Sequence, residues 1–198
     1  AHRTSSFTLD KVGRVTRRSI PDPDGAGALT SPTTYYAYNS LVTVTSVTDL
    51  GCGDWQFSRL MDWSGIAYTG FDLVDFVVER NRQAYGTDTI RFEVMEEIEQ
   101  LPGGDLLLCK EVLQHLPNAL IAHYLDVIAS RYRFALLTNA IEPLDDANRD
   151  ISAGDWRPLR LEQAPFSVPG ANVCVYFPQS GSHCWRNGVF LMLGNRGR

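Results

Sequence analysis

The chain has 198 residues, of which 44% are hydrophobic, and a formal net charge of −5 with a pI near 5.3. This length suits one domain with a core of its own, and the acidic balance argues against a broad nucleic-acid or anionic-membrane footprint, which needs clustered Lys and Arg. No apolar run of about 18 residues occurs, so no membrane span is expected. The four cysteines lack any C-x-x-C pairing, which predicts reduced thiols, no metal site and a cytoplasmic protein.

The first 34 residues combine several prolines and glycines with polar side chains. Such a composition predicts an extended lead-in or lid over 1–34, followed by one domain over 35–198. Its aromatic end, which starts at Tyr35, either folds over a ligand or covers the edge of a sheet. The chain is also compatible with being one part of a larger multidomain protein.

From residue 45 onward, short apolar runs alternate with helical periodicity, which is typical of βαβ units and a parallel sheet. The expected core strands are 46–50, 67–72, 90–95, 105–110 and 134–138. The expected helices are 55–61, 75–85 and 118–131, the last with Asn118 as N-cap.

The last sixty residues lose this periodicity until Asn187-Gly188, a pair of residues typical of a hairpin turn. The apolar run 189–193 that follows is expected as a strand in the edge region of the sheet. Residues 142–170 are expected to form an irregular cover over the substrate side, and an antiparallel hairpin finishes the sheet.

A glycine motif follows the first core strand, in the stretch D-L-G-C-G-D-W that begins at Asp49. Gly51 and Gly53 permit a sharp turn and the close approach of a ligand to main-chain N–H groups. Asp72 follows Gly53 by 19 residues, near the offset at which a carboxylate meets ribose hydroxyls. A dinucleotide is disfavoured because the third glycine of G-x-G-x-x-G is replaced by Gln56. A tight strand-to-helix turn without a ligand also explains the glycines alone.

These residues resemble the class I methyltransferases that use S-adenosylmethionine (SAM), and the resemblance covers about residues 25–195. The segments that carry it are DLGCGDWQFSRLMDWSGIAYTGFDLVDFVVERNRQAYG, DLLLCKEVLQHLPN and DISAGDWRPLRLEQAPF, which look like small stand-alone bacterial methyltransferase domains. The resemblance implies a Rossmann-like α/β fold with a seven-stranded, mostly parallel sheet flanked by helices and ending in an antiparallel C-terminal hairpin. One departure is that many relatives carry a third small residue where this chain has Asp54 and Trp55.

The resemblance also implies which residues hold SAM and its product, S-adenosylhomocysteine. Asp49 would meet the ammonium group, Asp72 the ribose, and Leu73 the adenine ring. Either Glu96 or its neighbour Glu97 would accept from the adenine amine. The remaining cofactor candidates are the loop and strand-end residues Gly51, Cys52, Gly53, Asp54, Trp55, Lys110 and Glu111.

His115 is the candidate general base, because its ordinary pKa suits proton abstraction from a hydroxyl near neutral pH. A capping or packing role next to the following helix is the alternative. The candidate acceptor-site residues are Tyr35, Trp55, Trp156 and Arg157. Arg157 would pair with a carboxylate or phosphate of the acceptor, or else with Asp150 or Asp155 in a structural ion pair.

The predicted function is therefore methyl transfer from SAM to a small-molecule or saccharide-type acceptor, at a hydroxyl. Two alternatives stay open. One is a methyltransferase domain of a larger polypeptide that acts on nucleic acid or protein, although the residues after Lys110 do not supply the Asn/Asp-Pro-Pro-aromatic motif for base amines. The other is a non-catalytic module that binds SAM or its product.

Overall fold

The computed structural model describes residues 6–9, 15–19, 33–35, 43–177 and 186–195. The chain divides into two compact units, Ala1–Thr43 and Val44–Arg198. In the first unit, β1 (Ser6–Leu9), β2 (Val15–Ser19) and β3 (Thr33–Tyr35) form an antiparallel sheet in that order. The described part of the expected lead-in is therefore a small sheet, and the aromatic residues 36 and 38 lie outside the described residues.

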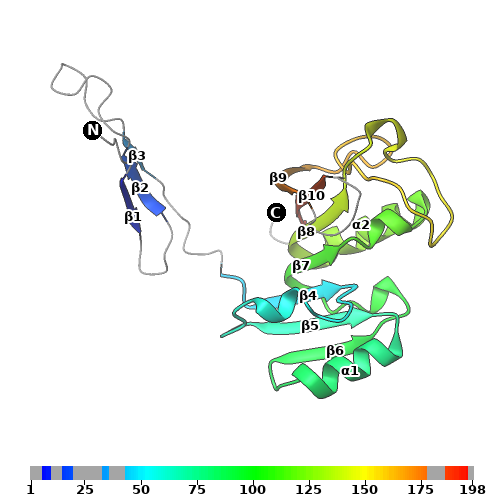
Figure 1. The fold of residues 1–198 in the computed structure, drawn as a ribbon, viewed down its shortest axis with the longest axis horizontal. Coiled ribbons are helices and arrows are strands. Elements are labelled where there is room, and N and C mark those ends of the chain that lie inside the picture. Colours follow the sequence, from blue (N-terminus) through cyan, green and yellow to red (C-terminus); the bar gives the residue numbers. More distant parts are fainter. Residues whose placement is uncertain (1–5, 10–14, 20–32, 36–42, 178–185, 196–198) are drawn as a thin grey trace. The chain divides into compact units, whose positions relative to one another are not determined.

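The second unit is built on one seven-stranded sheet (Figure 1). Its strands lie in the order β6-β5-β4-β7-β8-β10-β9, where β4 to β8 are parallel and β10 is antiparallel to both of its neighbours. Their bounds are β4 Ser46–Leu50, β5 Ala67–Asp72, β6 Ile90–Val94, β7 Gly104–Lys110, β8 Tyr132–Ala140, β9 Gly170–Tyr176 and β10 Asn187–Leu193. The predicted mostly parallel sheet with an antiparallel C-terminal hairpin is confirmed.

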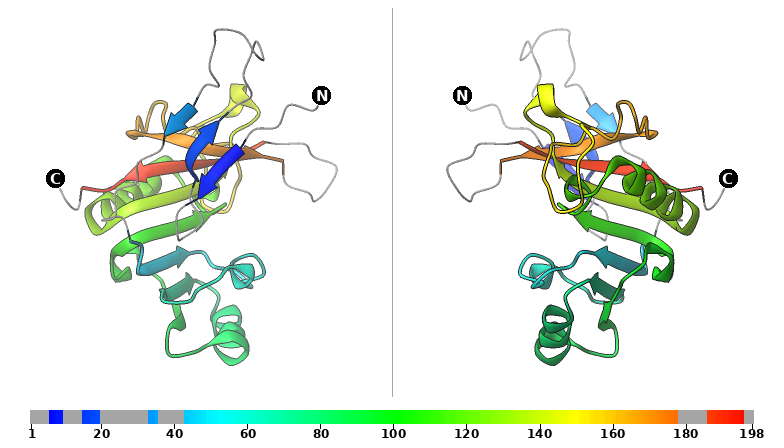
Figure 2. Two further views of the ribbon diagram at one scale, coloured as in Figure 1. Left: turned by 90° about the vertical axis from the view of Figure 1, so that its left-hand side faces the viewer. Right: turned by 90° about the vertical axis from the view of Figure 1, so that its right-hand side faces the viewer.

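Two α-helices connect the parallel strands, α1 (Asp75–Tyr85) beside β6 and α2 (Asn118–Arg131) beside β8 (Figure 2). Both match their predicted bounds. The α2 helix buries Ile121, Leu125 and Ile128, which recur at helical spacing, in the main core. Its N-cap is Pro117 and not Asn118, because Asn118 is already helical and its N–H donates to Asp150 Oδ1 at 2.8 Å.

The third predicted helix is wrong in extent, since only the 3₁₀ helix Ser58–Leu60 forms between β4 and β5. Trp55 takes a left-handed conformation with φ 59°, which an α-helix cannot include. Further short 3₁₀ helices are Ile98–Gln100, Leu113–His115 and Leu144–Asp146. The last lies in the predicted irregular cover, which has no other helix or strand before β9.

The C-terminal strand lies in the edge region of the sheet, as predicted: β10 lies between β8 and the edge strand β9. Asn187 and Gly188 begin this strand and do not form its turn: Gly188 pairs with Asn139 on one side and Val175 on the other. A Cβ at Gly188 would lie 2.6 Å from Asn172 Oδ1, so the glycine serves close strand packing.

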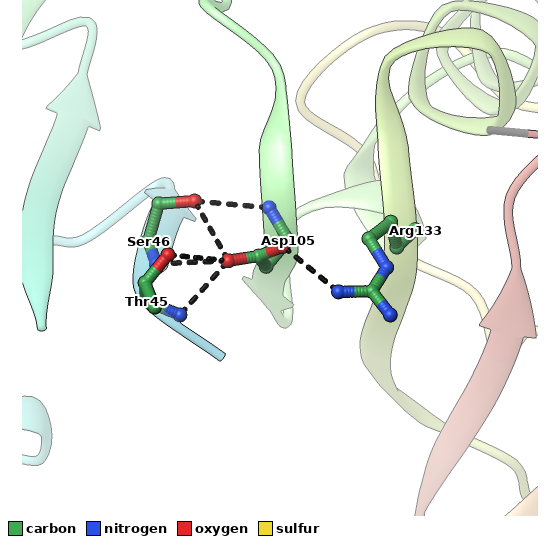
Figure 3. A network of polar contacts seen from close by, with 4 residues as sticks. All are labelled: Thr45, Ser46, Asp105 and Arg133. Atoms are coloured by element: carbon green, nitrogen blue, oxygen red, sulfur yellow. Dashed lines mark hydrogen bonds and ion pairs between the residues drawn. The ribbon is translucent and has the colours of Figure 1, made fainter. Parts of the chain in front are cut away.

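A polar network ties the amino ends of β4, β7 and β8 together (Figure 3). Asp105 Oδ2 accepts from the N–H and the hydroxyl of Thr45 at 2.8 and 2.9 Å, and from the N–H of Ser46 at 3.3 Å. Asp105 Oδ1 accepts from Arg133 Nη1 at 3.2 Å. These hydrogen bonds, led by that from the Thr45 N–H, lower the pKa of Asp105 to about 2.

Candidate functional site

The carboxyl ends of the parallel strands meet at the edge of the sheet opposite this network. The chain runs from β4 outward through β5 and β6 and then returns to β7 on the other side of β4. This reversal of strand order next to β4 is the place where open α/β sheets bind ligands. The turn after β4 is the predicted glycine motif.

The glycine loop is fastened to the end of β5. The N–H groups of Gly51 and Cys52 both donate to Phe71 O, at 2.8 and 3.0 Å. The Gly53 N–H donates to Asp72 Oδ2 at 2.9 Å, and the Val74 N–H donates to Asp72 Oδ1 at 3.1 Å. A carboxylate has about four acceptor positions, so Asp72 keeps capacity for two hydroxyl donors.

The two glycines of the motif serve different purposes. A Cβ on Gly51 would lie 2.3 Å from Val112 Cγ2, so this glycine lets the segment after β7 pack directly on the loop. Gly53 has φ +53° and nothing within 4 Å of where its Cβ would be. Gly53 is therefore the more open of the two glycines, although its own N–H is already used by Asp72.

The loop is also held from α1, by residues that sequence reasoning did not find. Asn81 Nδ2 donates to Gly53 O at 2.7 Å, and Arg80 Nη2 donates to Asp54 O at 3.5 Å. Asn81 is fully buried. The available signal was a polar side chain three residues after the buried Val78, on the core face of the helix.

Asp49 is buried at the end of β4, and its Oδ2 accepts from the hydroxyls of Tyr68 at 2.6 Å and Ser58 at 2.8 Å. Burial raises the pKa of this carboxyl, against the opposing effect of the two hydroxyl hydrogen bonds and the nearby charge of Lys110. Burial also raises the pKa of the neighbouring Cys52 thiol. Two buried hydroxyls therefore already orient the Asp49 carboxylate. The predicted ligand ammonium would have to bind the same carboxylate.

Trp55 does not line an acceptor pocket, contrary to the sequence interpretation. It is 5% exposed and packs against Tyr68, Tyr85 and Phe92, with ring centroids 5.5, 5.0 and 5.2 Å away. Its left-handed backbone accompanies this burial in the aromatic core behind the loop. Leu73, by contrast, is 68% exposed at the start of the segment that leads into α1, where the adenine contact was expected.

The two acidic candidates after β6 have different surroundings. Glu97 caps the 3₁₀ helix Ile98–Gln100: its side chain accepts from the Gln100 N–H, and Gln100 Oε1 accepts from the N–H groups of Glu97 and Glu96. Both glutamates are exposed, and no described residue bonds to the Glu96 carboxylate. Glu96 is thus the acceptor that the local structure leaves available.

A pair of charged side chains lies at the carboxyl end of β7. Lys110 Nζ and Asn187 Nδ2 both donate to Glu111 Oε1, each at 2.9 Å. The Glu111 N–H donates to Thr138 O at 2.7 Å, and Glu111 has φ 58°.

His115 ends the 3₁₀ helix Leu113–His115 and is half-buried. Its Nδ1 lies 3.0 Å from Asp155 O, and its own carbonyl accepts from the Gly154 N–H at 2.9 Å. A carbonyl can only accept, so in neutral His115 the hydrogen bond assigns the proton to Nδ1 and leaves a lone pair on Nε2. The same arrangement orients catalytic imidazoles.

Arg157 is not an acceptor ligand. It is fully buried and bonds to carbonyl oxygens of Leu113 at 3.0 Å, Leu116 at 2.6 Å and Arg149 at 3.2 Å, with Asn118 Oδ1 at 2.9 Å. Burial lowers the pKa of this guanidinium to about 10. Arg157 therefore joins the segment before α2 to the irregular cover, and the expected ion pair is replaced by carbonyl contacts. Trp156 is half-buried beside it.

Other features of the described residues lie outside this edge. Two pockets, of about 720 and 450 Å³, are lined by no residue of the candidate site. The described residues contain no group of three His, Cys, Asp or Glu side chains placed to hold a metal ion. Among the helices of the described ranges, none combines the length and apolar character that a membrane crossing requires.

The sheet order and the placement of the glycine loop define the fold of the class I SAM-dependent methyltransferases. No family model matches the sequence, and no curated protein matches it. Solved structures do match. Magnesium protoporphyrin IX methyltransferase from Synechocystis PCC 6803 with bound SAH is 18% identical with a TM-score of 0.53, over 77% of this chain and 76% of that one.

Two further structures support the same fold. TehB from Haemophilus influenzae is 11% identical with a TM-score of 0.56, over 96% of this chain and 85% of that one. The mitomycin 7-O-methyltransferase MmcR is 17% identical with a TM-score of 0.55, over 80% of this chain and 51% of that one. At these identities the likeness establishes the fold.

Proposed function

We propose that this chain is a SAM-dependent methyltransferase that acts on a hydroxyl of a small-molecule or saccharide-type acceptor. The observation that carries the proposal is the joining of Gly53 to Asp72 by a 2.9 Å hydrogen bond at the carboxyl ends of two adjacent parallel strands. A fold without a ligand there needs the turn, but it does not need an open approach to Gly53 beside a partly used carboxylate.

The residues present fit the cofactor. Asp72 would accept from the ribose hydroxyls, the exposed Leu73 would lie against the adenine, and Glu96 would accept from its amine. Asp49, with Cys52 and Asp54 of the loop, would hold the methionine end, with Lys110 near enough to act on the charge of Asp49. When bound, SAM supplies an electrophilic methyl group on a charged sulfur, which is a good leaving group.

The protein then has to align the acceptor and remove its proton. Alignment lowers the barrier of such a displacement by about 7 to 11 kcal/mol, and a positioned base adds about 10² to 10⁴-fold. His115 would act as the base through Nε2, because its Nδ1 is held by Asp155 O. As the acceptor oxygen bonds to the methyl carbon and the carbon–sulfur bond breaks, the hydroxyl proton passes to Nε2. One of the structural neighbours is an O-methyltransferase by its name, which favours a hydroxyl acceptor.

The experiment has two stages. Isothermal titration calorimetry with SAM and S-adenosylhomocysteine tests cofactor binding, and a product-formation assay over a panel of hydroxylated acceptors, with RNA and protein as competing classes, tests transfer. Binding of both nucleosides with methylation of a small hydroxylated compound is the expected result. Binding without methylation of any acceptor supports the non-catalytic module, and methylation of RNA or protein alone supports the domain of a larger enzyme.

A further inference from the structure

Glu111 occupies the first position after β7, one residue before the segment that contacts the glycine loop. The next residue, Val112, fills the space that a side chain at Gly51 would need, with its Cγ2 only 2.3 Å from the Cβ position. The segment after β7 and the glycine loop are therefore packed together where the strand order of the sheet reverses. The Glu111 side chain is thus one residue away in the chain from the contact between Val112 and Gly51.

The backbone of Glu111 is strained. For a non-glycine residue, a φ of 58° costs on the order of 1 kcal/mol relative to the α and β regions of the backbone. Glutamate has no short side chain that could offset this cost by bonding to its own backbone. The Glu111 N–H is held by a 2.7 Å bond to Thr138 O, which closes the last pair of the ladder between β7 and β8, Lys110 with Thr138. Such strain accumulates where a side chain has to be aimed.

The carboxylate is oriented by two donors on the same oxygen. Asn187 is 5% exposed at the start of β10, and its Nδ2 and Lys110 Nζ both bond to Oε1. No described residue donates to Oε2, and the side chain of Glu111 is 36% exposed. One oxygen is thus anchored in the sheet and the other remains available at the strand ends.

Resting on the proposed function, we propose that Glu111 is the acceptor-site carboxylate: its free Oε2 accepts a hydrogen bond from an O–H or N–H group of the acceptor, next to the methyl being transferred. The acceptor is then a compound with a second donor group close to the methylated hydroxyl, as in a vicinal diol. Asn187 is a positioning residue, since it acts on the acceptor only through Glu111.

Sinefungin allows a test that needs no acceptor, because a carbon bearing an ammonium group replaces the methylated sulfur. Calorimetry measures the ratio of its affinity to that of S-adenosylhomocysteine for the wild-type chain, Glu111→Gln, Asn187→Ala and the control Glu93→Gln, which lies exposed on the edge strand β6. We expect the wild type to prefer sinefungin, because a charge-assisted hydrogen bond to Oε2 forms only with the ammonium. The ratio should fall at least fivefold in Glu111→Gln, fall less in Asn187→Ala, and stay constant in Glu93→Gln.

The outcomes separate the two proposals. If both nucleosides bind and the ratio is the same in Glu111→Gln as in the wild type, the carboxylate does not face the transferred group and this inference is wrong. If neither nucleoside binds the folded wild-type chain, the proposed function itself fails. Thermal melting of each variant shows whether it is folded, and Asn187→Ala provides the test through the same carboxylate should Glu111→Gln not fold.

Discussion

The backbone N–H of Gly53 donates to the carboxylate of Asp72 across 2.9 Å, and this bond joins the turn after β4 to the end of β5. The carboxylate also receives the Val74 N–H, so one side chain fixes both the glycine loop and the entry to α1. Asp72 consequently has a structural role and a proposed binding role at once. Variants have to distinguish the two.

The two motif glycines should respond differently to alanine. Gly51→Ala combines a left-handed φ of +73° with a 2.3 Å clash against Val112, and should lower the free energy of unfolding by about 2 to 4 kcal/mol. Gly53→Ala carries only the backbone cost of about 1 kcal/mol but should weaken S-adenosylhomocysteine binding at least tenfold. Urea unfolding and calorimetry measure the two effects.

The matched control is Gly65→Ala, which has φ +74° and nothing within 4 Å but lies outside the candidate site. It should lose stability like Gly53→Ala and keep full affinity. If Gly53→Ala bound the ligand as well as Gly65→Ala does, the open approach to Gly53 would have no part in binding. Adding Val112→Ala should recover part of the stability lost in Gly51→Ala.

His115→Gln should reduce turnover at least tenfold, because glutamine cannot take the acceptor proton. The affinity for S-adenosylhomocysteine should stay within twofold of the wild type, since His115 is assigned to the acceptor side. Steady-state kinetics on the acceptor found in the panel, together with calorimetry, provide the measurement. Near-normal turnover would exclude the base role. His115 would then have only the structural role of holding Asp155 and Gly154 by hydrogen bonds.

Arg157→Met should be a stability variant. The substitution removes a buried guanidinium from three carbonyl oxygens and one side-chain oxygen, and breaking such a buried polar group costs about 3 to 5 kcal/mol. Arg91→Met on the exposed face of β6 is the control and should change stability by less than about 0.5 kcal/mol. Full stability of Arg157→Met with a lost acceptor affinity would restore the original interpretation of Arg157 as an acceptor ligand.

The lowered pKa of Asp105 predicts that the stability of the fold depends on pH in the acid range. Its pKa is lowered from 3.8 to about 2 in the folded chain, so its contribution to stability is present above about pH 4 and disappears as the pH falls through 2. The difference in unfolding free energy between the wild type and Asp105→Asn should be about 1 to 3 kcal/mol at pH 7 and should shrink toward pH 2. A difference that is constant from pH 7 to pH 2 would show that the ionised carboxylate is not what stabilises the network.

Much of the fold could be predicted because the parallel strands and both helices are local patterns. The bounds of β4, β5, α1 and α2 follow from apolar runs and helical spacing alone. The insertion of β10 between β8 and β9 could not be predicted in this way, since strand order depends on pairing between residues far apart in the chain. The Asn187-Gly188 pair is typical of a turn, but here the glycine is needed because a Cβ at Gly188 would collide with Asn172.

The candidate site divides along the same line. The sequence identifies Gly53 and Asp72 by spacing, and the structure brings them into contact. The sequence does not reveal that Trp55 is buried in the core or that Arg157 binds carbonyl oxygens. Both depend on tertiary contacts that override the local pattern. Asn81 was missed for the same reason, since its partner is a backbone oxygen of the glycine loop.

The most direct test of the central claim is calorimetric titration of S-adenosylhomocysteine into the folded wild-type chain and into Asp72→Asn, with Asp88→Asn as the control. The proposal predicts that the wild type and Asp88→Asn bind with equal affinity. Asp72→Asn should remain folded by thermal melting and bind at least tenfold more weakly, because the amide presents one acceptor oxygen where the carboxylate presents two. A folded wild-type chain without measurable affinity, or an unchanged affinity in Asp72→Asn, would contradict the account.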